Sequence, residues 1–193
     1  MPIEIEAKVS VPEVDVVRKR LQEVGAEPAG SVVETNTFFD TDDRSLLAAD
    51  KGLRLRKKVN ASDKTDVKYI ITFKGPRRHG QLKSREEVEL VVEAEREAMS
   101  LLACLGYSRI LSFEKRRESW KLGGCSVELD ELPHLGTYVE IEGPNEGAIN
   151  KVRDQLHLTD RPLVKASYVA LLMTHLQERG DTKRAITFQS TAS

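Results

Sequence analysis

Charged side chains recur at every second position near the N-terminus. In residues 3–9, Glu4, Glu6 and Lys8 alternate with apolar residues. Because successive side chains of a β-strand point to opposite faces, this spacing places two carboxylates and an ammonium group together on one face. Carboxylates are typical ligands of Mg²⁺, and the ammonium group of a lysine binds phosphate as a point charge.

The same alternation returns in further segments that have the composition of strands. Nearly all of these segments carry two or more charges on one face, where uncharged polar residues would keep a solvated surface just as well. The basic residues at these positions are Arg54, Arg56, Lys58, Lys74, Arg85, Lys115 and Arg117, and the acidic ones are Glu87, Glu89, Glu128, Asp130, Glu140 and Glu142.

A mixture of cations and carboxylates suits a metal–polyphosphate ligand. Arg and Lys from several strands neutralise a triphosphate, which carries about four negative charges near neutral pH. The carboxylates would repel the triphosphate unless a divalent cation such as Mg²⁺ or Mn²⁺ lay between them. Charged faces of both signs therefore predict a site for a triphosphate together with a metal ion.

About eight mostly antiparallel strands must position these residues. We expect strands at residues 3–9, 31–40, 52–59, 67–74, 84–92, 112–122, 125–130 and 138–142. Apolar residues at helical spacing predict helices at residues 12–26 and 94–105, after Asn145 and after Ser167. The fold class is α+β. If the sheet closes into an eight-stranded antiparallel β-barrel with helices packed on the outside, the charges line a tunnel.

The length of the chain and its last residues predict a single domain. We expect residues 1–179 to form this domain, and residues 180–193, which show little periodicity, to form a disordered tail.

Composition limits the partners and the compartment. Thirty Lys and Arg residues against 31 Asp and Glu residues give a net charge of −1, so no basic field attracts nucleic acid or a membrane surface. The two cysteines are no disulfide framework, and neither a signal peptide nor an apolar run long enough to span a membrane is visible. We expect a cytoplasmic protein that binds no nucleic acid and no membrane.

The charged strand faces allow more than one interpretation. One is a sheet with a solvated face that is laced by cross-strand ion pairs. Another is a tunnel that binds a nucleotide or polyphosphate without turning it over. The third is a tunnel that carries out metal-dependent chemistry on a triphosphate.

Several motifs resemble one family. Glu4-x-Glu6-x-Lys8 is similar to the N-terminal signature of the CYTH, or triphosphate tunnel metalloenzyme, superfamily. The segments 39–41, 52–56, 72–76, 84–89, 113–117, 129–130 and 140–142 resemble its later strands and follow in the same order. The resemblance covers about residues 3–178 and implies an eight-stranded antiparallel tunnel that binds a triphosphate with a divalent metal, Mg²⁺ or Mn²⁺.

The resemblance also implies roles for individual residues. The phosphates would be bound by Lys8, Arg54, Arg56, Lys74, Arg85, Lys115 and Arg117, of which we expect Lys8, Arg56, Lys74 and Lys115 to act in catalysis. The metal would be bound by Glu4, Glu6, Asp130, Glu140 and Glu142, with Glu87 and Glu89 in support.

Members of this superfamily carry out different reactions. Some hydrolyse inorganic or organic triphosphates, and class IV adenylyl cyclases convert ATP to cyclic AMP and pyrophosphate. Residues 105–107, 113–115 and 165–168 look like the cyclase branch, whereas the Trp before the Arg pair of the thiamine triphosphatase branch is absent from residues 50–52. We expect a triphosphate phosphohydrolase acting on ATP, tripolyphosphate or a related molecule. An adenylyl cyclase and a non-catalytic binding module are the alternatives, and a homodimer is left open.

Overall fold

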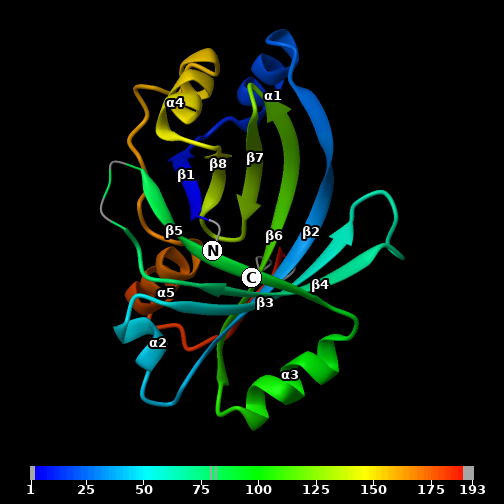
Figure 1. The fold of residues 1–193 in the computed structure, drawn as a ribbon, viewed down its shortest axis with the longest axis vertical. Helices are drawn as coiled ribbons and strands as arrows, with labels where there is room; N and C mark the ends of the chain where they lie inside the picture. The colour runs from blue at the N-terminus through cyan, green and yellow to red at the C-terminus, as the bar shows by residue number, and fades with distance from the viewer. Residues whose placement is uncertain (1–2, 79, 81, 189–193) are drawn as a thin grey trace.

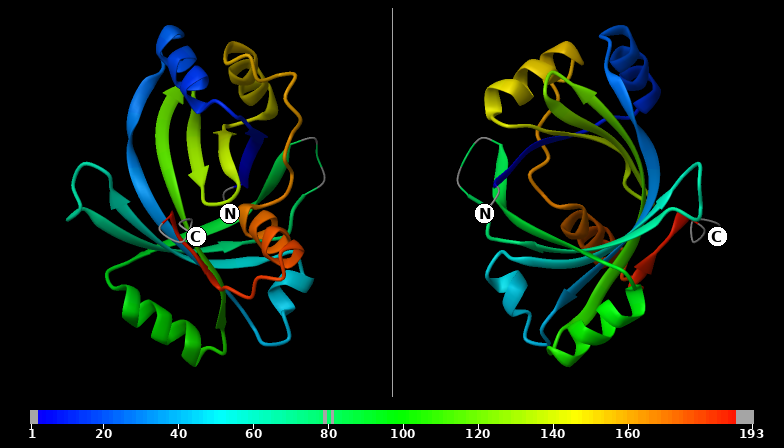
Figure 2. Two further views of the ribbon diagram at one scale, coloured as in Figure 1. Left: turned by 180° about the vertical axis from the view of Figure 1, so that it is seen from behind. Right: turned by 45° about the vertical axis from the view of Figure 1, so that its right-hand side comes forward.

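Eight antiparallel strands close into a ring in the computed structural model, which describes residues 3–78, 80 and 82–188. The order around the ring is β2-β3-β4-β5-β1-β8-β7-β6, and β6 pairs with β2 to complete it (Figure 2). The strands are β1 (Ile3–Ser10), β2 (Glu27–Asp40), β3 (Gly52–Asn60), β4 (Val67–Lys74), β5 (Lys83–Val92), β6 (Ser108–Leu122), β7 (Cys125–Leu132) and β8 (Gly136–Glu142) (Figure 1). The predicted α+β barrel is confirmed.

The helices cover the apolar outer faces of the strands. The helices are α1 (Val14–Glu23), α2 (Ser45–Ala48), α3 (Glu95–Cys104), α4 (Glu146–Gln155) and α5 (Tyr168–Glu178). Leu21 of α1 and Ile149 of α4 pack against Val127 and Ile141 of β7 and β8, and all four are fully buried. On the other side of the ring, α3 packs Leu102 against β3. The alternation that buries these apolar residues turns the charged ones inward.

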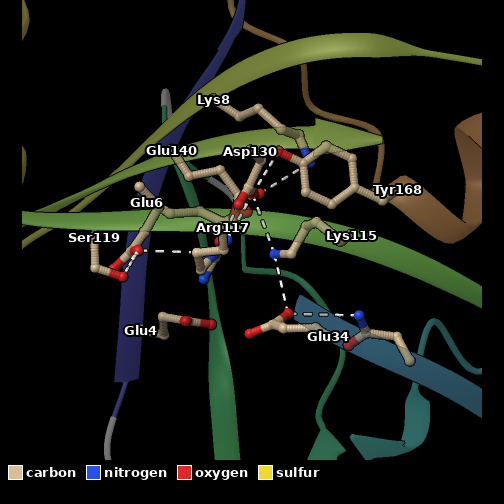
Figure 3. Close-up of polar contacts among 12 residues, drawn as sticks. Glu4, Glu6, Lys8, Glu34, Lys115, Arg117, Ser119, Asp130, Glu140 and Tyr168 are labelled. Carbon is tan, nitrogen blue, oxygen red and sulfur yellow. Dashed lines mark hydrogen bonds and ion pairs between the residues drawn. The ribbon is translucent and has the colours of Figure 1, made fainter. Parts of the chain in front are cut away.

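Two predicted helix starts are confirmed by side-chain caps. The Asn145 side chain accepts a hydrogen bond from the backbone N–H of Ala148 at 2.9 Å, and the Ser167 hydroxyl accepts one from that of Ala170 at 3.3 Å. The second cap fixes the start of α5, and this helix contributes a side chain to the interior of the barrel. Tyr168, at its first turn, points into the ring (Figure 3).

Part of the C-terminal segment is ordered, so the prediction of a disordered tail is wrong at residues 185–186. These residues form β9 (Ala185–Ile186), which runs parallel to Ser112 and Phe113 of β6. The side chain of Ile186 is 2% exposed and packs with Leu172 and Leu176 of α5. A strand of two residues has no detectable periodicity, and this one is held by tertiary packing. Residues 189–193 lie outside the described part of the chain.

Among the described residues, no helix combines the length and the apolar character needed to cross a membrane.

Candidate functional site

A cavity of about 820 Å³ runs through the ring and is lined by side chains of all eight strands. Every residue predicted for the site lines this cavity except Asp130, which lies directly behind the lining. The structure therefore brings together Glu4, Glu6, Lys8, Arg54, Arg56, Lys74, Arg85, Glu87, Glu89, Lys115, Arg117, Glu140 and Glu142. Because the charges face an interior cavity, the interpretation as a sheet with a solvated outer face is wrong.

The two signs of charge are largely separated around the ring. The neighbouring strands β5, β1 and β8 form what we call the acidic wall, made of Glu4, Glu6, Glu87, Glu140 and Glu142. The neighbouring strands β3, β2 and β6 form the basic wall, made of Arg54, Arg56, Lys58, Lys115 and Arg117. A ligand in the tunnel meets cations on one side and carboxylates on the other, and the cations of the acidic wall are Lys8, Lys83 and Arg85.

Three carboxylates of the acidic wall crowd one another. Burial and a hydrogen bond with Glu4 raise the pKa of Glu87 to about 7, although Lys74 opposes this shift. Burial and the charge of Glu4 raise the pKa of Glu142 to about 7 as well. Burial also opposes ionisation of Glu4, but the hydrogen bond from Glu87 and the charges of Lys74 and Lys83 outweigh it and lower its pKa to about 2. Such crowding is what a bound cation would relieve.

Two lysines form ion pairs with the carboxylates of the acidic wall. Lys74 Nζ lies 3.5 Å from Glu4 Oε2 and also pairs with Glu87, and Lys83 Nζ lies 2.6 Å from Glu6 Oε1. As the side chains lie, no three acidic, His or Cys groups among the described residues are close enough together to hold a metal ion. The donor set still fits Mg²⁺ or Mn²⁺, because it consists of carboxylate oxygens that accumulate around Glu4. Binding would require the carboxylates to turn from the lysines toward the metal.

The sequence profile of the CYTH domain family matches residues 2–167. This chain belongs to the CYTH domain family. A relative in Methanocaldococcus jannaschii, MJ0240, carries the provisional name of an adenylate cyclase; it is 26% identical over 140 residues, which cover 72% of this chain and 76% of that one.

Solved structures share the fold of this CYTH domain. PH1819 of Pyrococcus horikoshii OT3 has a TM-score of 0.77 at 24% identity, over 89% of this chain and 99% of that one. HpAC1 of Hippeastrum, provisionally named an adenylyl cyclase and described as having a dominant triphosphatase activity, has a TM-score of 0.63 at 17% identity, over 95% of this chain and 98% of that one.

Asp130 of the CYTH domain holds two cations of the basic wall in place (Figure 3). Its carboxylate accepts hydrogen bonds from Arg117 Nε at 2.7 Å and Nη2 at 2.6 Å, from Lys115 Nζ at 3.2 Å and from the Tyr168 hydroxyl at 2.9 Å. Oδ1 accepts one of these bonds and Oδ2 accepts the other three. In this arrangement Asp130 orients basic side chains, and the metal role that the resemblance implies for it stays a prediction.

Glu34, on β2, is a residue of the site that the sequence analysis missed. It is fully buried within the basic wall, where its carboxylate lies 3.3 Å from Lys115 Nζ, 3.3 Å from Arg56 Nε and 3.7 Å from Lys58 Nζ. Burial opposes its ionisation, but the charges of Lys115, Arg56 and Arg117 keep the pKa of Glu34 well below its usual range. The sequence feature that could have identified Glu34 is its spacing of two residues from Asn36, which places both side chains on the inner face of β2.

Tyr168 is the second residue whose position was not predicted. Its ring lies 4.0 Å from Lys8 Nζ and 5.4 Å from Lys115 Nζ, measured to the ring centroid, while its hydroxyl donates to Asp130. One aromatic side chain from α5 thus contacts cations on two walls of the tunnel. The sequence places Tyr168 at the first turn of a helix, and only the docking of that helix on the ring shows its role.

Two arginines of the tunnel each have a buried N–H group for which the described residues provide no hydrogen-bond acceptor. Nε of Arg54 and Nε of Arg85 are buried and have no hydrogen-bond partner among the described residues. Both side chains line the cavity. Buried donors without partners are costly, so both groups are available to an acceptor that enters the cavity.

Proposed function

We propose that this CYTH domain binds the triphosphate group of a small molecule in its tunnel, together with a divalent metal, and hydrolyses it. The observation that carries the proposal is the pairing of a basic wall with an acidic wall inside one cavity. Either wall alone would suit a simple anion or cation. The two together suit a polyphosphate whose remaining charge is shared with a metal ion.

In this proposal the basic residues bind and orient the phosphates. Arg54 and Arg56 offer forked donors, and Lys8, Lys74 and Lys115 act as point charges. Arg117 adds its positive charge, although its Nε and Nη2 already donate to Asp130. Because these groups come from different strands, they contact a linear triphosphate from several sides and stabilise the charge that develops as a phosphoryl group leaves.

The acidic wall supplies the metal ligands. Glu4, Glu6, Glu140 and Glu142 would hold Mg²⁺ or Mn²⁺, with Glu87 and Glu89 in support, while Asp130 keeps Lys115 and Arg117 in position. The metal would neutralise phosphate charge and polarise a phosphoryl oxygen.

Hydrolysis is the reaction we favour, and support comes from HpAC1, the Hippeastrum neighbour described as having a dominant triphosphatase activity. Conversion of ATP to cyclic AMP and pyrophosphate is the second candidate, favoured by the name given to the M. jannaschii relative. The two reactions differ in the nucleophile, which is water in the first and the ribose 3′-oxygen in the second.

The test combines binding with product analysis. The purified protein is titrated calorimetrically with tripolyphosphate, with and without Mg²⁺, and then assayed on tripolyphosphate, ATP and thiamine triphosphate for phosphate release and cyclic AMP. We expect metal-dependent binding and phosphate release. Cyclic AMP as the main product would support the cyclase, binding without turnover would support a binding module, and no binding at millimolar ligand would overturn the proposal.

A charge-neutral variant of the acidic wall tests the metal assignment. Replacing Glu4 and Glu6 by Gln should reduce metal-dependent activity by at least about 10- to 100-fold, the loss seen when even the hydrogen-bond partners of metal ligands are altered. Glu86→Gln is the matched control, because Glu86 lies on the same strand as Glu87 but pairs with Arg78 near the surface. Equal metal dependence in the double variant and the wild type would remove Glu4 and Glu6 from the metal site.

A further inference from the structure

Lys83 is a cation of the tunnel to which neither the sequence analysis nor the proposed function gives a role. It is the first residue of β5 and lies one residue before the strand that the sequence predicts there. Its side chain lines the cavity and is 13% exposed. Its ammonium group lies 2.6 Å from Oε1 of Glu6, whose side chain is 11% exposed. The two residues thus form a largely buried ion pair inside the acidic wall.

The register of the sheet shows what surrounds this ion pair. Glu6 of β1 lies directly opposite Lys83 of β5 on one side and directly opposite Glu142 of β8 on the other. All three side chains line the cavity, so they form one row across three neighbouring strands, which we call the central row. Side chains at directly opposite positions have Cβ atoms about 4.5–5.5 Å apart. The central row therefore holds two carboxylates beside a single ammonium group.

The rows on either side of the central row are balanced in charge. Lys8 lies opposite Glu140, and Arg85 lies opposite Glu4. The central row, in contrast, has one carboxylate more than it has cations, which leaves Glu142 without a cation in its own row. A further positive charge would therefore be stabilised most strongly in the central row.

Lys83 and a divalent metal compete for the same carboxylate. The proposed function counts Glu6 and Glu142 among the metal ligands. Bonding both carboxylates to Mg²⁺ or Mn²⁺ would bring two positive charges to the central row, whereas Lys83 brings one. A monovalent ion would bring no more charge than the ammonium group that it replaces. The ion pair between Lys83 and Glu6 has to be broken in either case, and a divalent ion offsets that loss with its higher charge.

We propose that Lys83 is a displaceable counter-ion that holds Glu6 while the metal is absent and gives it up when Mg²⁺ or Mn²⁺ binds. The inference rests on the proposed function, because it assumes that Glu6 is a metal ligand. Lys83 is then a positioning residue, which acts through Glu6. It stabilises the empty acidic wall and at the same time lowers the affinity of this wall for metal.

The affinity for Mn²⁺ tests the proposal. Free Mn²⁺ is measured by its paramagnetic resonance signal in titrations of the wild type, Lys83→Gln and Lys83→Met, first without and then with tripolyphosphate. We expect both neutral variants to bind Mn²⁺ about 10- to 100-fold more tightly, because a hydrogen bond between charged groups no longer has to be broken. Lys83→Arg keeps the charge and should bind Mn²⁺ within about threefold of the wild type.

Thermal unfolding is the second measurement, and it does not depend on turnover. Without metal, Lys83→Gln should melt at a lower temperature than the wild type, because Glu6 loses its partner. A fixed concentration of Mn²⁺ should then raise the melting temperature of the variant more than that of the wild type. Lys121→Gln is the matched control, because Lys121 is an exposed lysine of β6 outside the cavity that donates to the Ser126 hydroxyl. It should change neither the affinity for Mn²⁺ nor its effect on melting.

The outcomes separate this inference from the proposed function. If the wild type binds Mn²⁺ and the two neutral variants bind it no more tightly, the inference is wrong and the proposed function stands. If Lys83→Arg binds Mn²⁺ as tightly as the neutral variants do, the charge of Lys83 is not responsible, and the inference is wrong as well. If neither the wild type nor a neutral variant binds Mn²⁺, with or without tripolyphosphate, the metal role in the proposed function fails, and the inference fails with it.

Discussion

Glu34 is a carboxylate at the centre of a cluster of cations, and its effect is on stability and geometry. Without it, Lys115, Arg56 and Lys58 would repel one another inside the basic wall. Removing one partner of a buried ion pair destabilises a protein by about 3–5 kcal/mol, because the remaining charges are left uncompensated. The same carboxylate keeps the cations in the orientation in which a triphosphate would meet them.

We expect Glu34→Gln to lower the free energy of unfolding by about 3–5 kcal/mol. Tripolyphosphate should then raise the melting temperature of the variant more than that of the wild type, because the anion compensates the charge that Glu34 no longer offsets. Thermal unfolding with and without tripolyphosphate measures both effects. Glu131→Gln, which removes an exposed pair with Arg116, is the control and should cost at most about 1 kcal/mol. A variant as stable as the wild type would contradict this role of Glu34.

The low pKa of Glu34 also predicts how stability depends on pH. Because the pKa is depressed in the folded state, the stabilisation from this group is fully present above the unfolded pKa, about 4.3, and is lost as the pH falls toward the folded pKa. The difference in unfolding free energy between the wild type and Glu34→Gln should be constant from pH 6 to 8 and decrease below about pH 4.3. Urea unfolding of both proteins across this range measures the difference. About one pH unit below the unfolded pKa, this difference in unfolding free energy should have decreased by about 1.4 kcal/mol. A difference that is still unchanged at that pH would contradict the assignment.

At the scale of elements, α5 and β9 support the tunnel from one side. Ile186 of β9 is the contact between them, because it is buried among Leu172, Leu176 and Phe113. Phe113 in turn belongs to the strand that carries Lys115 and Arg117. The short strand therefore stabilises a wall of the candidate site although it contributes no side chain to the cavity.

Ile186→Ala should lower the free energy of unfolding by about 2–5 kcal/mol, the usual cost of truncating a buried aliphatic side chain. Chemical denaturation measures the loss. Lys183→Ala, at an exposed position of the same segment, is the control and should change stability by less than about 0.5 kcal/mol. If Ile186→Ala is as stable as the wild type, then β9 does not pack on α5 and β6 in solution.

The strands and their inner faces were predictable because two-residue alternation is a local property of the sequence. Glu4, Glu6 and Lys8 alternate with apolar residues on one strand, and the structure turns all three inward. On β2 the pattern is ambiguous, because Phe38 and Phe39 place an aromatic ring on each face, and Glu34 was missed there. The pairing of β2 with β6 and the contact of Tyr168 with Lys8 depend on distant parts of the chain, which a local pattern does not encode.

At the scale of the whole molecule, closure of the ring places the charged side chains around one shared cavity. The strands surround the lumen, so each charge is less screened than it would be on an open sheet, and the two walls face each other across one cavity. Closure also removes the free edges that an eight-stranded sheet would expose. The arrangement of β3, β2 and β6 opposite β5, β1 and β8 keeps the signs of charge apart.

The position of β1 in the ring has a consequence for folding. Among the strands of the ring, β1 is synthesised first, yet it pairs with β5 and with β8, which is the last strand of the ring to be synthesised. Pairing of residues so distant in the sequence is slow, on the scale of milliseconds to seconds for folds dominated by such contacts. Until β8 is available, one edge of β1 stays unpaired. Charged side chains on an unpaired strand disfavour its pairing with another chain, so we expect Glu4, Glu6 and Lys8 to limit aggregation of the unfinished chain.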